Sequence, residues 1–202
     1  MTRLFSLLLF IFSFSTQAST LLVLGDSLSA GYQMSENQAW PSFLTDELAH
    51  KGIEIETING SVSGDTTGNG LARLPQLLTQ HKPSYVLIEL GANDGLRGFP
   101  PKLIKNNLTQ IIEISRQSGA QVIMMQIQVP PNYGRRYTQS FEQVYPTLSE
   151  QQSVPLMPFF LAQIITNDDL MMQDGLHPKP EAQPWIAQYV AENIANIINK
   201  GN

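Results

Sequence analysis

The chain has 202 residues, with 12 Lys and Arg, 17 Asp and Glu, and a formal net charge of −5. This acidic balance lacks the basic stripe that nucleic-acid binding requires, so we expect no nucleic-acid partner. The sequence contains no cysteine, which excludes disulfides, thiolate catalysis and cysteine-ligated zinc. Imidazole chemistry is therefore restricted to His50, His81 and His177.

The first 18 residues have the pattern of a secretory signal peptide. Arg3 supplies a positive charge, residues 4–14 form an apolar run, and residues 16–18 (TQA) supply small residues before a cleavage point near Ala18. The run is too short to span a bilayer as a helix, which makes an uncleaved anchor the weaker alternative. We expect a periplasmic or secreted monomer without stable membrane insertion, formed by one domain over residues 19–202.

Apolar segments alternate with amphipathic helical segments along this domain. The predicted strands cover residues 20–25, 53–58, 84–90, 121–129 and 154–157. The predicted helices cover residues 39–51, 71–81, 102–118, 138–151, 159–165 and 181–199, and their buried faces include Leu103 and Trp185. This alternation predicts a three-layer α/β/α fold with a doubly wound, five-stranded parallel sheet.

A serine follows the first predicted strand where sheet proteins place their sites. The apolar run over residues 21–24 stops at Gly25, and Asp26 and Ser27 lead into a helical segment. Ligands of open α/β sheets bind at the carboxyl ends of strands, and a helix N-terminus favours developing negative charge. Ser27 is therefore a candidate nucleophile, although the same residue types also form ordinary turns.

Four candidate residues fall just past elements that we place at the same edge of the sheet: Ser27, Gly64, Asn93 and His177. Ser27 would attack an acyl carbon, His177 would accept its proton, and Asp174 would orient the imidazole. Backbone N–H groups of Ser27 and Gly64, together with the Asn93 side-chain amide, would bind the oxyanion. The reaction needs neither a metal ion nor an organic cofactor.

Each of these residue types also has a purely structural interpretation. His177 alone could be a loop histidine, and we expect Asp26 and Asp94 to hydrogen-bond nearby backbone N–H groups even in an enzyme. His50 and His81 lie at predicted surface helix ends, and we assign them no chemistry.

Four motifs resemble, in their order, the SGNH (GDSL) hydrolase family. They are GDSLS at 25–29, SGDT at 63–66, GAND at 91–94 and DGLHP at 174–178. Three further segments are similar to the family's branch of bacterial periplasmic thioesterases, lysophospholipases and arylesterases: GLARLP at 70–75, NDGLRGF at 93–99 and NYGRRY at 132–137.

The resemblance implies a flavodoxin-like sheet and a reaction without cofactors. It also implies Ser27 as nucleophile, His177 with Asp174 as base, and Gly64 and Asn93 as oxyanion donors. The chain departs from close relatives at Ala92, where these often carry a second glycine; the difference matters only if that position needs a positive φ.

The residues expected around the site are apolar, which favours a fatty-acyl or aryl group over a sugar. They are Leu28, Leu96, Phe99, Tyr133, Met171, Met172 and Leu176. We expect the substrate to be a small acyl ester, thioester or lysophospholipid. Segment 95–101 would place Leu96 and Phe99 over the acyl chain as a lid; the alternative is that both pack permanently on the domain.

Three other functions are weighed against this hydrolase. A carbohydrate O-acetylesterase could use the same fold and site. A non-catalytic lipid carrier would not need Ser27, Asn93, Asp174 and His177 together. A metal-dependent phosphoesterase is disfavoured because a single well-placed histidine cannot furnish a two-metal site.

Overall fold

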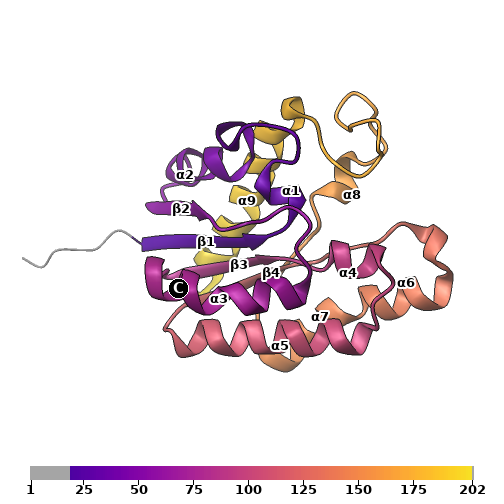
Figure 1. Cartoon of the computed structure of the whole chain (residues 1–202). Helices are drawn as coiled ribbons and strands as arrows, with labels where there is room; N and C mark the ends of the chain where they lie inside the picture. Colours follow the sequence, from indigo (N-terminus) through magenta and orange to yellow (C-terminus); the bar gives the residue numbers. More distant parts are fainter. Residues whose placement is uncertain (1–18, 202) are drawn as a thin grey trace, which may run out of the picture.

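Five parallel strands form the middle layer of the structure, a computed structural model that describes residues 19–201 (Figure 1). They are β1 (Ser19–Gly25), β2 (Ile55–Asn59), β3 (Tyr85–Glu89), β4 (Gln121–Met125) and β5 (Leu156–Met157). Their order is β2-β1-β3-β4-β5, and every neighbouring pair is parallel. This is the flavodoxin-like, doubly wound order, so the predicted fold class is confirmed.

Helices cover both faces of the sheet (Figure 1). Helix α2 (Pro41–Ala49) packs against α9 (Gln183–Gly201) on one face, and α3 (Thr67–His81) packs against α5 (Pro101–Gln117) on the other. The remaining helices are α1 (Ser27–Ala30), α4 (Ala92–Leu96), α6 (Arg135–Glu142), α7 (Val144–Gln152) and α8 (Leu161–Ile164). Single 3₁₀ turns occur at Glu36–Gln38, Pro131–Tyr133 and Pro180–Ala182.

The central strands carry continuous apolar runs because helices cover both of their faces. Residues 21–24 of β1 and 86–88 of β3 are fully buried, whereas β2 lies at the edge and is only half covered. The register pairs Gly25 with Glu89 and Val23 with Asn59. The first three strands therefore end side by side, and the segments that follow them meet at one edge of the sheet.

Three elements show the clearest differences from the prediction. Helix α3 begins at Thr67, four residues early, because Thr66 and Asn69 form a capping box in which each side chain accepts from the other's backbone N–H. The predicted helix 138–151 is two helices, α6 and α7, which meet at Gln143. Strand β4 ends at Met125, and residues beyond it leave the sheet and line a cavity.

Two residues expected in the core are exposed. Leu103 in α5 is 44% exposed and Trp185 in α9 is 38% exposed. Each directly precedes a fully buried isoleucine, Ile104 or Ile186. Because successive helical residues point about 100° apart, a side chain next to the buried stripe turns toward solvent.

Candidate active site

Ser27 begins helix α1 directly after the central strand β1. Asp26 caps this helix, with its Oδ1 accepting from the backbone N–H of Leu28 at 3.1 Å. Gly25 has no room for a side chain, since a Cβ there would lie 2.8 Å from Glu89 Oε2 and from Ser29 Oγ. The strand thus ends in a tight turn, and Ser27 Oγ lies at the rim of a cavity.

Ser27, His177 and Asp174 form a continuous hydrogen-bonded chain. The Ser27 hydroxyl lies 2.9 Å from His177 Nε2, and His177 Nδ1 lies 2.7 Å from Asp174 Oδ2. With Nδ1–H donating to the carboxylate, Nε2 is free to accept the serine proton. The side chains that the sequence assigns to nucleophile, base and orienting acid are therefore within hydrogen-bond reach.

The Asp174 carboxylate is held by its own loop. Its Oδ1 accepts from the backbone N–H groups of Leu176 at 2.9 Å and His177 at 3.0 Å. Partial burial opposes ionisation, but these hydrogen bonds and the His177 ring outweigh it and lower the pKa of Asp174. The carboxylate therefore stays charged and fixed beside the imidazole.

Tyr32 covers one face of the His177 ring. The two rings stack with centroids 4.0 Å apart and an interplanar angle of 23°. Tyr32 stands between Gly31 (φ 81°) and Gln33 (φ 56°), two left-handed residues that turn the chain after α1. Sequence reasoning missed Tyr32, because no motif indicates where this turn directs the ring.

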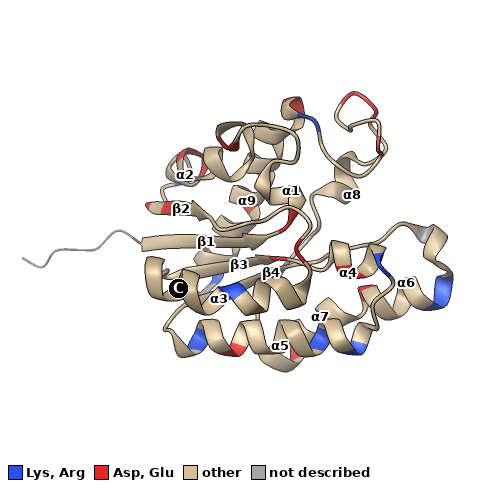
Figure 2. Ribbon diagram, in the orientation of Figure 1, with Lys and Arg blue, Asp and Glu red and all other residues tan. Residues whose placement is uncertain are grey.

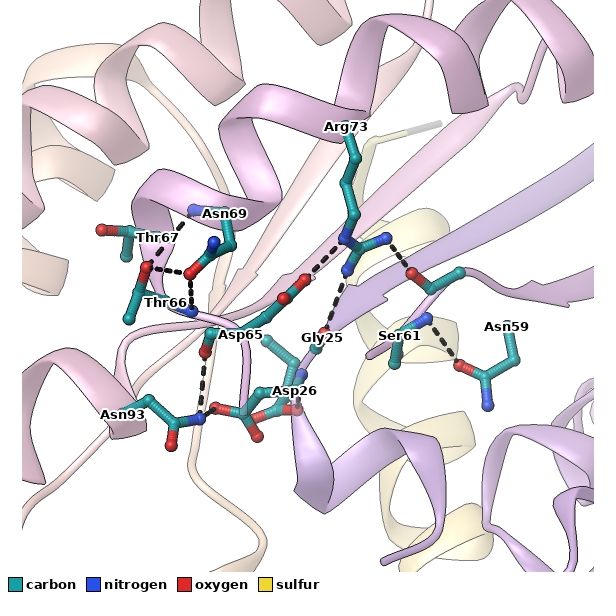
Figure 3. A network of polar contacts seen from close by, with 12 residues as sticks. Gly25, Asp26, Asn59, Ser61, Asp65, Thr66, Thr67, Asn69, Arg73 and Asn93 are labelled. Atoms are coloured by element: carbon teal, nitrogen blue, oxygen red, sulfur yellow. Dashed lines mark hydrogen bonds and ion pairs between the residues drawn. The ribbon is translucent and has the colours of Figure 1, made fainter. Parts of the chain in front are cut away.

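The proposed oxyanion donors lie on the segments that follow β1, β2 and β3. Ser27, Gly64 and Asn93 all line the same cavity. Gly64 has φ 86°, a left-handed conformation that favours glycine, and a Cβ there would meet no atom within 4 Å. Asn93 Nδ2 donates to the backbone oxygen of Asp65 at 2.9 Å and to Asp26 Oδ2 at 3.2 Å (Figure 3).

Ala92 fits its position without backbone strain. It begins helix α4, whereas the positive φ of this turn falls on Gly91 (φ 124°). A Cβ on Gly91 would lie 2.0 Å from Tyr145 Oη, so glycine is required there. The departure from close relatives at Ala92 therefore does not disturb the turn that carries Asn93.

Two buried carboxyl groups, Asp26 and Glu89, lie next to the turn that carries Ser27, where acidic segments gather at the ends of β1 and β3 (Figure 2). Burial raises the pKa of Asp26 to about 7 despite hydrogen bonds from Leu28 and Asn93. Burial also raises the pKa of Glu89 well above its ordinary value, and the nearby Asp26 charge adds to this. Glu89 Oε2 accepts from Ser29 Oγ at 2.6 Å, while Oε1 has no hydrogen-bond partner among the described residues.

Asp94 has the structural role that its sequence context predicts. Its carboxylate accepts from the backbone N–H of Thr67 at 2.8 Å and from the Thr67 hydroxyl at 2.6 Å. These bonds tie α4 to the first residue of α3, and so fix the segment that carries Asn93.

An apolar cavity of about 540 Å³ opens beside Ser27 and His177. Leu28, Leu96 and Leu176 line it, as the sequence predicts. A second part of the wall was not predicted and comes from Val129, Phe159, Leu161 and Ile165. These residues were missed because residues 121–129 were interpreted as one strand and 159–165 as a short helix with no link to the site.

Four residues expected around the site lie outside the cavity lining: Phe99, Tyr133, Met171 and Met172. Phe99 turns back onto the core because its N–H donates to Asp94 O at 2.9 Å. The Tyr133 hydroxyl donates to Leu96 O at 2.9 Å, and the Tyr137 hydroxyl donates to Phe99 O at 2.8 Å. Both tyrosines therefore anchor segment 95–101 from outside the cavity, and Met171 is buried.

His50 and His81 lie at the ends of α2 and α3, away from the cavity lining. Within residues 19–201, no three acidic or histidine side chains are grouped closely enough to bind a metal ion. In the same range, no helix is both long and apolar enough to cross a bilayer. The expected signal peptide lies outside the described residues.

The family model described as "GDSL-like Lipase/Acylhydrolase family" matches residues 23–183. An arylesterase of Vibrio mimicus is 64% identical over 196 residues, which cover 96% of this chain and 98% of the relative. The thioesterase 1/protease 1/lysophospholipase L1 of Escherichia coli K12 is 48% identical over 182 residues, which cover 90% of this chain and 86% of the relative. Among solved structures, the psychrotrophic esterase EstA from Pseudoalteromonas sp., inhibited by monoethylphosphonate, is similar with a TM-score of 0.86 and 43% identity. The match covers 90% of this chain and 99% of the EstA chain. The sequence motifs, the fold and these similarities agree: this chain belongs to the GDSL-like lipase/acylhydrolase family, the SGNH hydrolases.

Proposed function

We propose that the protein is a serine hydrolase that cleaves carboxylic esters and thioesters with fatty-acyl or aryl groups through an acyl-enzyme on Ser27. The observation that carries this proposal is the chain from Ser27 Oγ through His177 to Asp174 at the rim of an apolar cavity. Two short contacts support it: Ser27 Oγ lies 2.9 Å from His177 Nε2, and His177 Nδ1 lies 2.7 Å from Asp174 Oδ2.

Acylation begins when Ser27 Oγ attacks the substrate carbonyl carbon and His177 Nε2 accepts the hydroxyl proton. The imidazolium formed is stabilised by the Asp174 carboxylate at Nδ1. Negative charge on the carbonyl oxygen is bound by the N–H groups of Ser27 and Gly64 and by the Asn93 amide. The protonated imidazole then gives its proton to the departing alcohol or thiol.

Deacylation repeats these steps with water as the attacking group. His177 accepts a proton from water, the resulting hydroxide attacks the acyl carbon, and the proton returns to Ser27 Oγ as the acid leaves. In the resting geometry Asn93 Nδ2 donates to Asp26 and Asp65. Stabilising the oxyanion therefore requires the amide to share or exchange one of these bonds.

The cavity wall favours an acyl or aryl group over a sugar. Leu28, Leu96 and Leu176 lie near Ser27, and Phe159 and Ile165 extend the apolar wall. Each buried methylene contributes roughly 0.8 kcal/mol to binding, so this wall rewards a longer chain. The same bond classes occur in the names of the relatives, arylesterase and thioesterase/lysophospholipase.

Export would limit the substrates that the enzyme can reach. With residues 1–18 acting as a secretory signal, the enzyme would work outside the cytoplasm, as a periplasmic or secreted monomer. Lysophospholipids and simple esters then fit better than coenzyme A thioesters. We assign the reaction no metal ion, no organic cofactor and no nucleic-acid partner.

A series of nitrophenyl esters from acetyl to palmitoyl tests the substrate class, and lysophospholipids and acyl thioesters extend it. We expect kcat/KM to rise with chain length up to the limit of the cavity. A carbohydrate O-acetylesterase would instead prefer acetyl and lose activity with longer chains. A lipid carrier would bind the long-chain compounds without turning any of them over.

A further inference from the structure

The three proposed oxyanion donors lie on three separate segments, and one side chain, Arg73, is bonded to two of these segments directly and to the third through Asp65 (Figure 3). Arg73, in the second turn of α3, donates from Nε to Asp65 Oδ2 at 2.6 Å. Its terminal nitrogens donate to the backbone oxygen of Gly60 and, at 3.2 Å, to that of Gly25. A single guanidinium thus satisfies three acceptors, one at the end of β1 and two in the loop that follows β2.

Each acceptor belongs to a segment that carries an oxyanion donor. Gly25 ends β1 two residues before Ser27. Gly60 follows β2 and begins the loop that leads to Gly64. Asp65 directly follows Gly64 in that loop.

The link to Asn93 runs through the same residue, Asp65. While its carboxylate pairs with Arg73, its backbone oxygen accepts from Asn93 Nδ2 at 2.9 Å. A shift of the Asp65 backbone would therefore move both the Gly64 N–H before it and the partner of the Asn93 amide. Arg73 and Asp65 are absent from the cavity lining, so they act on the site only through these segments.

The contact between Arg73 and Asp65 has two features that favour a fixed geometry. The Asp65 and Arg73 side chains are 12% and 22% exposed, so solvent screens their contact little. Guanidinium is planar and presents five N–H donors in a fixed fork, whereas a lysine ammonium is a point charge on a flexible stem. Lysine could keep the charge opposite Asp65 but could not hold two strand-end carbonyls in the same plane.

We propose that Arg73 and Asp65 form a positioning pair that holds the Gly64 N–H and the Asn93 amide at the spacing an oxyanion needs. This inference rests on the proposed function, because it assigns a purpose to a network behind that reaction's donors. Donors that act on transition-state charge change kcat far more than KM when they are misplaced. A merely structural arginine would change the amount of folded protein and leave the rate per folded site unchanged.

The test compares Arg73→Met and Arg73→Lys with a matched control, Arg116→Met. Arg116 in α5 also donates to two backbone oxygens, those of Gln152 at 2.7 Å and Ser153 at 3.1 Å, but it lies outside the cavity lining. Activity on nitrophenyl butyrate is measured well below each variant's melting temperature. Rates are divided by the concentration of sites that a fluorophosphonate titrates, which removes any loss of folded protein.

We expect Arg73→Met to lower kcat per titrated site by about 10- to 100-fold with KM within about twofold, since loss of one complete donor costs on the order of 10²–10³ in rate. The kcat per titrated site of Arg73→Lys should lie between those of Arg73→Met and the wild type, and that of Arg116→Met should match the wild type. If Arg73→Met fails to fold, Arg73→Lys supplies the same comparison.

The positioning role is overturned if either Arg73 variant keeps the wild-type kcat per titrated site, or if KM rises while kcat stays constant. Failure of the proposed function gives a different result. In that case the fluorophosphonate labels no site on the wild type, or Ser27→Ala keeps its activity, whatever the arginine variants do.

Discussion

His177 is held from three directions by neighbouring side chains. Ser27 and Asp174 contact its two ring nitrogens, and the Tyr32 ring stacks on its face. In the proposed mechanism the ring becomes a cation when Ser27 attacks a substrate. A carboxylate and an aromatic face both favour that positive charge, so the surroundings of His177 support the charged intermediate.

The buried carboxyl of Glu89 makes stability depend on pH. Burial raises the pKa of Glu89 in the folded protein, so the native state holds a proton that the unfolded chain has lost. The resulting stabilisation is complete below the pKa of Glu89 in the unfolded chain, roughly 4.3, and is lost as pH rises through its pKa in the folded protein. Between these two pKa values the free energy of unfolding falls by up to ~1.4 kcal/mol per pH unit for one proton. Glu89→Gln removes this dependence, because glutamine stays neutral.

Urea unfolding between pH 5 and pH 9 measures this effect. We expect the free energy of unfolding of Glu89→Gln to lie within about 1 kcal/mol of the wild-type value at pH 5, since one neutral hydrogen-bonding group replaces another. The stability difference should then move in favour of the variant as pH rises. Glu113→Gln, at an exposed position of α5, is the control and should parallel the wild type. Parallel curves for Glu89→Gln and wild type would show that Glu89 is not protonated in the native state.

Single residues were predictable where a motif marks them. Ser27, Gly64, Asn93, Asp174 and His177 were chosen from the sequence, and the structure brings them to one cavity or, for Asp174, into contact with His177. Their roles in catalysis stay predictions until variants are measured. Tyr32 and Arg73 could not be chosen, because a left-handed turn positions Tyr32, and Arg73 is positioned by the meeting of the β1 end with the loop after β2.

At the level of elements, the segment over residues 95–101 was expected to act as a lid with two apolar residues facing the substrate. The structure separates these two residues. Leu96 lines the cavity, whereas Phe99 packs on the core and its backbone oxygen accepts from the Tyr137 hydroxyl. The alternative of permanent packing therefore describes Phe99, and we expect only Leu96 of the two to contact the substrate.

Leu96→Ala and Phe99→Ala form a matched pair that tests this division. Removing the Leu96 side chain should lower kcat/KM for decanoyl esters by about 5- to 20-fold relative to acetyl esters, because each lost methylene contact is worth roughly 0.8 kcal/mol. Phe99→Ala should lower the melting temperature and reduce activity equally for all chain lengths. A chain-length effect at Phe99 with none at Leu96 would reverse the assignment.

Other elements could be predicted where their sequence pattern is clear, and were missed where their bounds depend on contacts that the pattern does not show. The five strands and their parallel order were predictable from apolar runs that alternate with helical segments. The start of α3 was missed because its signal is the reciprocal bonding of Thr66 and Asn69 within a loop rich in small residues. The end of β4 was missed because residues 127 and 129 stay buried beyond the sheet and so continue the apolar run.

For the whole molecule, parallel order places the ends of β1, β2 and β3 at one edge, and each strand is followed by one residue that we propose as an oxyanion donor, Ser27, Gly64 or Asn93. Helices α3 and α4 fix this edge through the bonds of Arg73 and Asp94. The predicted fold, the family and the ester and thioester hydrolase class are confirmed by the strand order and by the close relatives. The domain boundaries and the export signal stay predictions.

The central claim is that hydrolysis passes through an acyl-enzyme on Ser27. The most direct measurement is mass-spectrometric mapping of the adduct that a fluorophosphonate leaves on the protein, combined with turnover of a nitrophenyl ester. We predict one adduct, on the peptide that contains Ser27, and its absence together with loss of turnover in a folded Ser27→Ala variant. An adduct on another residue, or a Ser27→Ala variant that still hydrolyses the ester, would contradict the account.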